Sequence, residues 1–423
     1  MKFKIITLGC KVNQYESEMI KEKLINNNYI ETLDNDADVI IINTCSVTNM
    51  ADAKSRKLIR YNKRENKGAI TVVCGCSAQN KQEKLNDLDI DILIGNNDKS
   101  RIVELIEEFK KNNKKYIKFV NSRKLEFENM AVDNFSHTRA YIKIQDGCNN
   151  FCAYCIIPFV RGNIRSKDIN EVIKEANLLV ENNHKEIVLT GIDTGSYGKD
   201  KGYDLTDLLE KLVKIDNLER IRLSSIDIYD LNDRFIECLK NNSKLCDHLH
   251  ISLQSGSDKI LKLMNRKYDT KEYESIINKI RKVRSNISIT TDVIVGFPGE
   301  TEDDFKDCIN FCKKIKFSKI HVFPFSKRDG TKAAVMPGQL DMKTKRDRAR
   351  KLIKVSEQLE NDYYNLFLNK ELEVLIEEVN GDISIGHTSN FIKITIKEKL
   401  ERNKIYKVII TGIKNNEVYG KLK

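Results

Sequence analysis

Short apolar runs rich in β-branched residues alternate with amphipathic helical stretches along most of the chain. In the first third, apolar runs lie at 3–8, 39–42, 70–73 and 91–94, and helical patterns lie between or after them, as at 17–26 and 99–111. Strands separated by single helices are typical of a parallel sheet. The pattern therefore predicts an N-terminal parallel α/β domain over 1–120.

The alternation resumes after a stretch without clear periodicity at 121–134. Apolar runs lie at 141–144, 187–190, 221–224, 248–253, 287–295 and 320–323, with helical patterns near 170–181, 205–214, 231–240, 271–283 and 301–315. Six successive strand–helix units predict a partial (β/α)6 barrel over 134–340, which is incomplete beside the eight-unit form. Functional residues of such barrels gather at the carboxyl ends of the strands.

The last part of the chain changes pattern twice. A basic helix is predicted at 341–366, with an apolar stripe of Leu352, Val355, Leu359 and Leu366. After Phe367 the pattern has a period of two, which predicts short strands and a small β-barrel of the oligonucleotide-binding kind over 367–423. Such barrels bind nucleic acid by shape and charge, and a capping domain without a ligand is the alternative.

Composition narrows the function classes. The chain has 423 residues, 11 cysteines and a net charge of +11. An odd cysteine count without a secretory signal favours a reducing, cytoplasmic compartment and metal ligation rather than disulfides. The sequence holds no apolar stretch long enough to cross a membrane. The net charge suggests an anionic partner, although a lysine-rich composition alone would give the same charge.

Three cysteines follow the first strand of the expected barrel with the spacing C-x3-C-x2-C. They are Cys148, Cys152 and Cys155. The segment is too short for a helix face or a strand ladder, so it is expected to be a loop that turns three thiolates toward one point, as an iron–sulfur cluster needs. A four-iron cluster on three cysteines leaves one iron open to a small molecule. Zinc is the alternative, but its sites usually add a second cysteine pair or histidines, and no histidine lies within ten residues after Cys155.

A second set of cysteines follows the first three strands of the N-terminal sheet. Cys10, Cys45 and Cys76 each lie in a turn that ends a strand, and the carboxyl ends of parallel strands meet at one edge. We expect a second three-cysteine cluster there; small residues packed in tight turns are the alternative. The remaining cysteines are expected to be core residues, not ligands: Cys74, Cys238, Cys246, Cys308 and Cys312.

Two further groups of residues suggest binding surfaces. Glycines and hydroxyls collect on the expected barrel rim, among them Thr190, Gly191, Ser225, Gln254, Gly296 and Pro298. Singly each is a turn or a helix cap, but together beside a cluster they favour a cofactor pocket. Basic residues that could contact phosphates, or simply form solvated faces, are Lys54, Arg56, Lys57, Arg60, Arg64, Lys345 and Arg346.

Taken in order, these motifs resemble the radical S-adenosylmethionine (SAM) methylthiotransferases over nearly the whole chain. The resemblance rests on the two cysteine sets, the expected terminal barrel of the TRAM kind, and runs such as Ser252 to Ser257, Met264 to Arg266 and Thr291 to Thr301. The segments from Gly9 to Glu16 and from Asn43 to Asn49 look like the branch that acts on threonylcarbamoyladenosine, 3′-adjacent to the anticodon at position 37 of tRNA. Ser77 departs from the aromatic residue that commonly follows the third cysteine.

The resemblance implies a mechanism and its partners. Two [4Fe-4S] clusters are implied, and the one on Cys148, Cys152 and Cys155 would bind SAM and cleave it to a radical that activates C2–H of the adenine. The cluster on Cys10, Cys45 and Cys76 would carry the sulfur, methylated by a second SAM. SAM would be held by Tyr154, Thr190, Gly191, Ser225, Gln254, Arg266, Val295, Gly296 and Pro298, with Arg266 paired to the SAM carboxylate.

The expected partners are tRNA, a flavodoxin- or ferredoxin-like reductant and a sulfur donor, for a monomer that needs no membrane. Three rival functions remain: methylthiolation of isopentenyladenosine in tRNA, methylthiolation of a ribosomal protein side chain, and electron transfer. Net basicity and the segment from Lys11 to Glu16 favour RNA over a ribosomal protein. An electron-transfer protein would be expected to use four cysteines per cluster.

Overall fold

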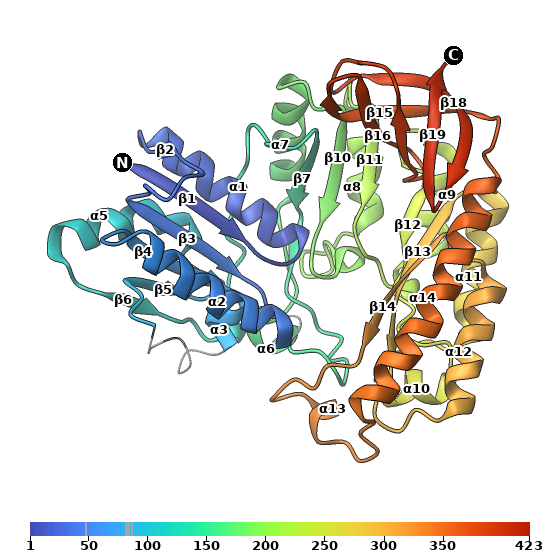
Figure 1. The fold of residues 1–423 in the computed structure, drawn as a ribbon, viewed down its shortest axis with the longest axis horizontal. Helices are drawn as coiled ribbons and strands as arrows, with labels where there is room; N and C mark the ends of the chain where they lie inside the picture. The colour runs from blue at the N-terminus through green and yellow to red at the C-terminus, as the bar shows by residue number, and fades with distance from the viewer. Residues whose placement is uncertain (47–48, 81–84, 86–87) are drawn as a thin grey trace.

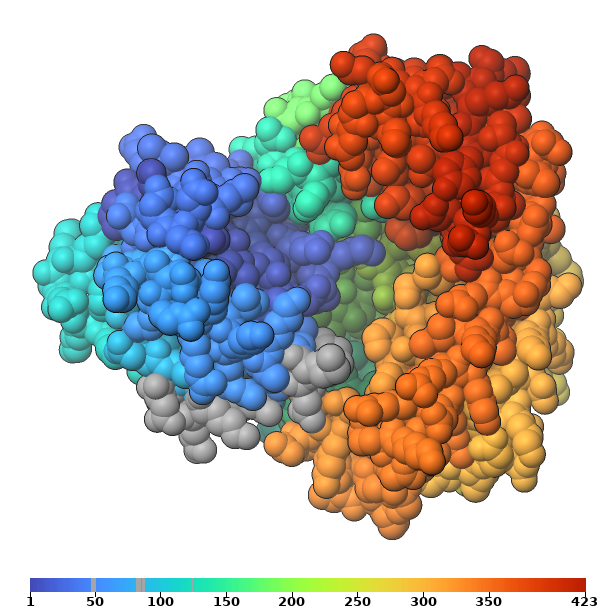
Figure 2. Space-filling view, viewed as in Figure 1, coloured from blue at the N-terminus to red at the C-terminus, as the bar shows by residue number. Residues whose placement is uncertain are grey.

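The computed structural model describes residues 1–46, 49–80, 85 and 88–423. The N-terminal sheet lies on one side of the molecule, a curved sheet surrounded by helices lies in the middle, and a small barrel closes the C-terminus (Figure 1). Figure 2 shows a hollow between the N-terminal part and the region of α13 and α14, with residues of the middle part at its floor. Across the described ranges, no helix is long and apolar enough to cross a membrane.

The N-terminal sheet is parallel, with the order β2-β1-β3-β4-β5-β6 in the described part of the chain. Its strands are β1 (Lys2–Thr7), β2 (Ile30–Glu31), β3 (Val39–Thr44), β4 (Ile70–Gly75), β5 (Ile92–Ile94) and β6 (Tyr116–Lys118). The helices are α1 (Lys11–Asn26), α2 (Asn49–Glu65), α3 (Cys76–Asn80), η1 (Lys99–Arg101) and α5 (Ile102–Asn112). The expected parallel α/β sheet is confirmed.

Helix α1 begins six residues earlier than its apolar pattern predicts. Cys10 has extended backbone and caps the helix, so the first turn starts at Lys11. Asn13 and Glu16 in that first part are buried and hydrogen-bonded to neighbouring elements. Polar residues on a buried face hide the helical pattern, because periodicity arguments assume that polar residues face solvent.

The middle of the chain forms the expected curved set of parallel strands. They are β7 (Arg139–Lys143), β10 (Glu186–Thr190), β11 (Arg220–Leu223), β12 (His248–His250), β13 (Ser288–Val295) and β14 (Lys319–Pro324). The strands form sheets of order β11-β10-β7 and β12-β13-β14, which parallel bridges from Ile221 and Ile226 join. The result is a half-barrel, and the expectation of six barrel strands is confirmed among the described residues.

Helices cover the outside of this half-barrel. The larger ones are α7 (Ile169–Glu181), α8 (Leu205–Leu212), α9 (Asp233–Asn241), α11 (Thr270–Val283) and α12 (Glu302–Ile315). Shorter elements are η2 (Ser122–Lys124), β8 (Gln145–Asp146), α6 (Ile157–Val160), β9 (Arg165–Ser166), η3 (Thr194–Ser196), η4 (Ile228–Asp230), α10 (Asp258–Leu263) and α13 (Lys332–Val335). Strand residues such as Ile187, Leu249 and Val293 pack outward into the helix layer, so alternate residues face the inside of the half-barrel.

Helix α14 (Met342–Asn365) packs along β14 and against α12 rather than spanning open space between domains. Lys319 of β14 pairs with Glu360 at 2.8 Å, and Arg348 pairs with Glu300 at 2.5 Å. Of the predicted apolar stripe, Leu352 is buried, whereas Leu366 is 52% exposed. The stripe prediction is wrong at Leu366, because polar residues take part of the buried face of this helix.

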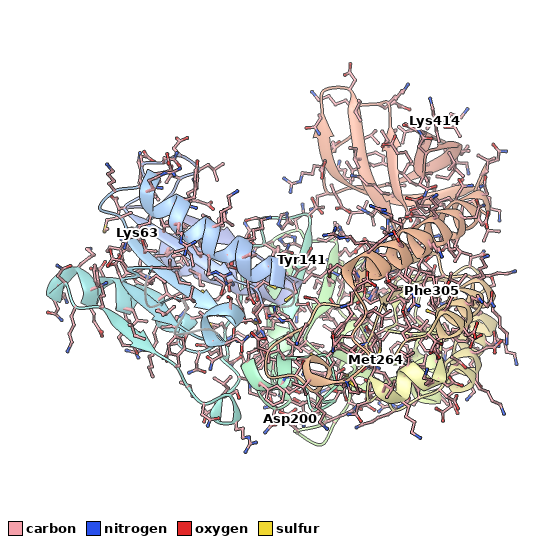
Figure 3. The ribbon with its side chains drawn as sticks, turned by 60° about the horizontal axis from the view of Figure 1, so that its bottom comes forward. Lys63, Tyr141, Asp200, Met264, Phe305 and Lys414 are labelled. Atoms are coloured by element: carbon pink, nitrogen blue, oxygen red, sulfur yellow. The ribbon has the colours of Figure 1, made fainter. Side chains whose placement is uncertain are left out.

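The last strands, β15 (Glu371–Asn380), β16 (Ile383–Thr388), β17 (Lys393–Ile396), β18 (Ile405–Lys414) and β19 (Glu417–Leu422), form a closed barrel. Arginines at the start of β11 fix it to the half-barrel: Arg220 donates to Glu373 O at 2.9 Å and Arg222 to Ser389 O at 3.0 Å. The Phe391 ring lies under the Arg222 and Arg139 guanidinium groups, at 4.8 and 5.1 Å. Figure 3 shows Tyr141 of β7 near the centre of the molecule and Lys63 and Lys414 on its outer parts.

Candidate functional site: two cysteine sites across an interface

The loop that follows β7 and β8 folds its three cysteines into a compact turn. The Cys155 N–H donates to Cys152 O and the Cys148 N–H to Gly162 O, each at 3.0 Å. Gly147 has a φ of +72°, and a Cβ there would lie 1.9 Å from Asn163 O, so only glycine fits. The three thiols are partly buried and belong to one loop, as the spacing predicts.

The chemistry of these three thiols suits a metal cluster. Burial raises the pKa of Cys148, and Asp193 and the two other thiols raise it further. Burial also raises the pKa of Cys155 to about 12, with Cys152 adding to the effect. Partly buried thiols that lie close together stay protonated unless a cation lies among them. A [4Fe-4S] cluster ligated by the three would supply that positive charge, so these residues fit it.

Polar residues from distant parts of the chain surround this loop. Arg266 lies beside it, with Nη1 3.3 Å from Cys152 Sγ and Nε 3.1 Å from Tyr268 Oη, and its Nη2 pairs with Asp227. Asn150 Nδ2 donates to Asp193 at 3.2 Å and to Asp227 at 3.0 Å. The structure therefore brings Arg266 to the cluster loop. Sequence reasoning missed Asp193 and Asp227, since a lone aspartate after a strand carries no distinctive signal.

A cavity of about 240 Å³ lies next to Cys155. Its lining includes Tyr154, Cys155, Gln254, Asp292, Phe323 and Arg328. Of the residues expected to bind SAM, Tyr154 and Gln254 belong to this lining. Gln254 has a φ of +68°, and its carbonyl accepts from Ile294 N at 2.9 Å. Thr190 is buried, with its Oγ1 3.2 Å from Ser224 Oγ, whereas Ser225 is exposed and Gly191 packs against Gln145.

The expected SAM contacts at the end of β13 do not line this cavity. Val295 is fully buried in the helix-facing core. The Gly296 N–H donates to Glu300 Oε2 at 2.7 Å, and a Cβ on Gly296 would lie 2.5 Å from Lys345 Cγ. Pro298 is buried in the same turn. Helix α14, whose docking the sequence does not reveal, covers this turn and makes Gly296 a packing residue.

The N-terminal cysteines meet at the carboxyl edge of their sheet. Gly9, with a φ of +105°, lies so close to Cys45 that a Cβ would be 2.8 Å from its Sγ. Asn13 Nδ2 joins the first two turns by donating to Leu8 O at 2.7 Å and to Thr44 O at 3.0 Å. Cys10 is exposed as a residue, but desolvation by the atoms around its thiol raises the pKa of that thiol, while Arg161 lowers it and Cys76 raises it. Residues 47 and 48 of the expected motif lie outside the described residues.

Arg161, which follows the C-x3-C-x2-C loop by six residues, enters the N-terminal site. Its Nε lies 3.1 Å from Cys76 Sγ, and its Nη2 donates to Asn13 Oδ1 at 2.8 Å. Its Nη1 pairs with Glu16 and Asp146, each at 3.0 Å. The side chain is completely buried. A cationic donor beside the Cys76 sulfur that also acts on Cys10 suits an anionic thiolate cluster, so the residues of the second site also fit a [4Fe-4S] group.

The two cysteine sites are neighbours. Ile156, directly after Cys155, packs with Val160 against Cys76. Arg328 lines the cavity beside Cys155, pairs with Asp52 at 2.9 Å and donates to Ser46 O, just after Cys45. Two cysteine sets more than 70 residues apart in sequence therefore lie on the two sides of the contact between the N-terminal sheet and the half-barrel. The other cysteines are buried elsewhere: Cys74, Cys238, Cys246, Cys308 and Cys312.

The basic residues expected to contact RNA divide into exposed and buried groups. Lys54, Lys57, Arg60 and Arg64 are exposed along α2, whereas Arg56 is half-buried. Arg346 at the start of α14 is exposed, but Lys345 is only 6% exposed, with its ammonium 5.0 Å from the centre of the Phe325 ring. Lys345 is therefore a packing residue in this conformation, and its predicted phosphate contact is not supported.

Comparisons with known proteins agree with this arrangement. Residues 142–312 match the radical SAM superfamily and residues 2–95 match the uncharacterized protein family UPF0004. Threonylcarbamoyladenosine tRNA methylthiotransferase MtaB of Bacillus subtilis is 42% identical over 402 residues, covering 92% of this chain and 89% of the relative. The chain belongs to the radical SAM methylthiotransferase family.

Other members of this methylthiotransferase family show how its substrates differ. MtaB of Aquifex aeolicus is 39% identical, over 97% of this chain and all of the relative. The tRNA-2-methylthio-N(6)-dimethylallyladenosine synthase of Alkaliphilus oremlandii is 37% identical, over 89% of this chain and 82% of the relative. Among solved structures, the radical SAM methyltransferase TsrM of Kitasatospora setae shares the fold, with a TM-score of 0.57 at 11% identity, covering 79% of this chain and 77% of TsrM.

Proposed function

We propose that this protein adds a methylthio group to C2 of N6-threonylcarbamoyladenosine at position 37 of tRNA, next to the anticodon. The observation that carries the proposal is the close approach of two three-cysteine sites, joined by Ile156 and Arg328. A reaction that activates a carbon at one site and supplies sulfur at the other needs both sites within reach of one substrate atom. The names of relatives at 36–42% identity agree with this substrate.

Six cysteines would hold the two [4Fe-4S] clusters: Cys148, Cys152 and Cys155 in one site, and Cys10, Cys45 and Cys76 in the other. When bound, the clusters and SAM supply the radical, the sulfur and the methyl group of the reaction. The protein's own residues would bind and orient the clusters, SAM and the substrate base. Arg266 is placed to hold a carboxylate near Cys152, and the Tyr154, Ile156 and Phe323 side chains form part of the cavity wall.

Several partners belong to the same proposal. The exposed basic face of α2 and the TRAM-like terminal barrel would bind the tRNA backbone. The reaction requires an electron donor of the flavodoxin or ferredoxin kind and a sulfur donor, and the protein would work as a monomer in the cytoplasm. We assign residues 1–120 to the sulfur-carrying domain, 134–340 to the radical SAM domain and 367–423 to the RNA-binding barrel. The segment 341–366 would brace β14 rather than serve as a free linker.

The test is a reaction of the reconstituted protein, under anaerobic conditions, with tRNA that carries threonylcarbamoyladenosine. Digestion to nucleosides and mass spectrometry should show the methylthio product, together with 5′-deoxyadenosine. Parallel reactions use tRNA that carries dimethylallyladenosine, and ribosomal protein. A product from either of those substrates alone would overturn the proposed substrate, and nucleosides from cells with and without this chain would give the same answer in vivo.

A further inference from the structure

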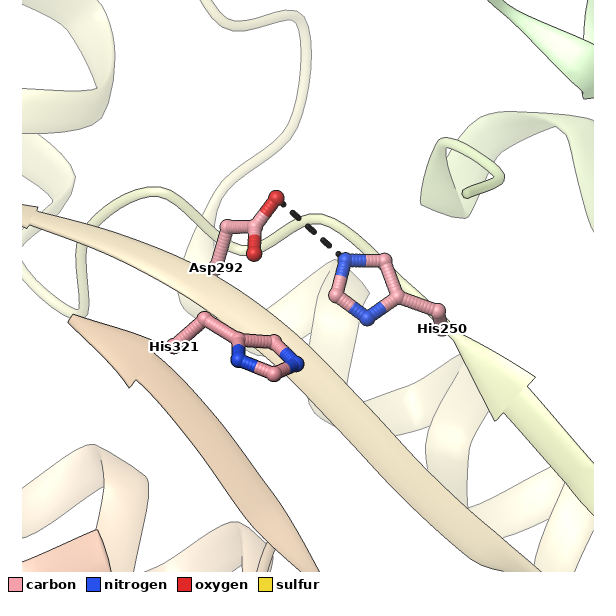
Figure 4. A group of neighbouring side chains, drawn as sticks. All are labelled: His250, Asp292 and His321. Carbon is pink, nitrogen blue, oxygen red and sulfur yellow. Dashed lines mark ion pairs between the residues drawn. The ribbon is translucent and has the colours of Figure 1, made fainter. Parts of the chain in front are cut away.

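The inner face of the half-barrel carries polar residues where its outer face is apolar. His250 of β12, Asp292 of β13 and His321 of β14 come from three neighbouring strands and converge (Figure 4). One nitrogen or oxygen atom of each lies within 4.8 Å of the others. His321 is exposed, and Phe323 two residues later is 45% exposed, so the chain does not fill this inner face. A polar, unfilled barrel interior is typical of a ligand site.

Hydrogen bonds hold one member of this group and leave the others available. His250 Nδ1 is 2.9 Å from Thr290 Oγ1, and His250 Nε2 is 3.3 Å from Asp292 Oδ2. Thr290 Oγ1 is also 3.0 Å from His248 Nε2, so the His250 ring is fixed in orientation. Within the described ranges, His321 has no hydrogen bond. Burial lowers the pKa of His321 and His250 lowers it further, so the neutral ring offers one donor and one acceptor.

An unpaired cation lies near the same inner face. Lys11, the first residue of α1, is partly buried and has neither a hydrogen bond nor an ion pair among the residues described. The charged or ionisable groups that act on it are Arg139, Arg222, Cys10 and Glu186. Glu186 is already paired with Arg222 at 2.6 Å, and Arg139 is paired with Glu377 at 3.0 Å. The positive charge of Lys11 also lowers the pKa of His248, and the His248 and His250 rings both bond the Thr290 hydroxyl. A partly desolvated ammonium that forms no ion pair of its own is a binding site for an anion.

We propose that Asp292, His321 and Lys11 bind the polar substituent on N6 of the substrate adenosine and thereby select it. This inference rests on the proposed function. The threonylcarbamoyl group carries ureido N–H donors, a hydroxyl and a carboxylate. The Asp292 carboxylate accepts from the ureido, the His321 ring bonds the hydroxyl, and the Lys11 ammonium pairs with the carboxylate. Asp292 also lines the cavity beside Cys155, which connects the substituent's site to the place where C2 must react.

A dimethylallyl group has none of these polar atoms. In this interior it would give the carboxylate, the imidazole and the ammonium no partner from the substrate, and sites built for polar groups reject apolar analogues strongly for that reason. Two histidines and an aspartate also resemble a divalent metal site. The positive charges of Lys11, Arg139 and Arg222 act on His248, which shares the Thr290 hydroxyl with His250, and charges of this sign oppose a metal cation and favour an anionic ligand.

The experiment measures binding, independently of turnover. Fluorescence anisotropy gives the Kd of the full-length reconstituted protein for anticodon stem-loops that differ only at N6: threonylcarbamoyl, dimethylallyl or unmodified adenosine. The wild type should prefer the threonylcarbamoyl stem-loop by about tenfold or more. His321→Phe and Lys11→Gln should each remove most of that preference. Lys11→Arg should restore it, and the exposed His137→Phe is the matched control.

Each outcome has a distinct meaning. An unchanged preference in both His321→Phe and Lys11→Gln, with full iron content, overturns the inference. Equal wild-type affinity for the three stem-loops also overturns it. A wild-type preference that the variants abolish, without any methylthio product in the reaction, supports the binding site and overturns the proposed function instead. Zinc or manganese bound by the wild type and lost in His321→Phe would show a metal site and overturn the substrate assignment.

Discussion

Arg161 Nε lies 3.1 Å from Cys76 Sγ, although Cys76 begins α3 of the N-terminal domain and Arg161 follows α6, 85 positions later. Arg161 also pairs with Glu16 and Asp146, and Lys143 bridges the same two carboxylates at 2.8 and 2.7 Å. Despite burial, Arg161, Lys143 and Lys99 lower the pKa of Glu16. The contact between the two parts of the molecule is thus a buried charge network that ends at a cluster ligand.

We expect Arg161→Met to disrupt the N-terminal site. The substitution leaves Glu16 and Asp146 with less positive charge, and breaking a buried pair typically costs about 3–5 kcal/mol. Arg161→Lys should bind less iron at the N-terminal site than the wild type. An ammonium cannot bond to Cys76, Asn13 and Glu16 at once as the guanidinium does. Iron content and absorbance after reconstitution measure the loss. Full iron content in Arg161→Met, with normal stability, would show that this arginine does not support the site.

Two independent clusters predict a simple iron count. Replacing Cys148, Cys152 and Cys155 together by Ala should leave about half of the wild-type iron, and so should the triple replacement of Cys10, Cys45 and Cys76. Cys308→Ala with Cys312→Ala is the matched control, because both are buried in the hydrophobic core, and it should keep all the iron. A triple variant that loses either all or none of its iron contradicts two separate sites.

The sequence predicts the elements, and which cysteines come together, better than it predicts the contacts between elements. Cys10, Cys45 and Cys76 could be assigned because parallel strands share one edge, and that rule needs no tertiary information. Arg161 could not be assigned, since its role depends on how the two sheets dock. The group of His250, Asp292 and His321 depends on the register of three strands. A shift of one residue would turn a side chain to the other face of the sheet. The packing of Gly296 against Lys345 of the distant helix α14 likewise has no signal in the sequence, and its expected contact with SAM stays a prediction.

Arg266 should decide SAM affinity. Its guanidinium lies beside Cys152 and pairs with Asp227, so it is positioned by one carboxylate while it offers charge to another. Arg266→Lys keeps the charge but loses the planar fork, and SAM binding should weaken by about tenfold. Calorimetry on the reconstituted protein measures the affinity. Lys267→Gln, an exposed neighbour, is the control, and an unchanged affinity in Arg266→Lys would remove Arg266 from the SAM site.

Asp230 should make stability fall as pH rises. Burial raises its pKa to about 7 and Asp193 adds to the shift, although Lys199 opposes it. Because the unfolded carboxyl ionises near its usual pKa, the folded state binds the extra proton between about pH 4 and 7, and stability declines across that window. Asp230→Asn should therefore gain melting temperature over the wild type as pH rises from 5 to 7, with little further gain above 7. A difference in melting temperature that stays constant between pH 5 and 7 would contradict the raised pKa of Asp230.

The final prediction separates recognition of tRNA from the chemistry. A truncation before the terminal barrel is a poor test, because it would expose Arg220, Arg222 and the surface under Phe391. Surface variants avoid that problem. One variant replaces Lys54, Lys57 and Arg60 of α2 by Gln, and the other replaces the exposed Lys393, Lys397 and Lys399 of the barrel. The control replaces Lys279, Lys306 and Lys314 on the outer helices α11 and α12.

If both surfaces contact phosphates, each triple variant should bind tRNA less tightly, and the slope of log affinity against log salt should become shallower by about 2 to 3. Reductive cleavage of SAM without tRNA should remain at the wild-type rate in both variants, because none of the six substituted residues lines the cavity beside Cys155. The control should change neither quantity. If only the α2 variant alters the salt slope, the terminal barrel braces the half-barrel through Arg220 and Arg222, and α2 carries the backbone contacts alone.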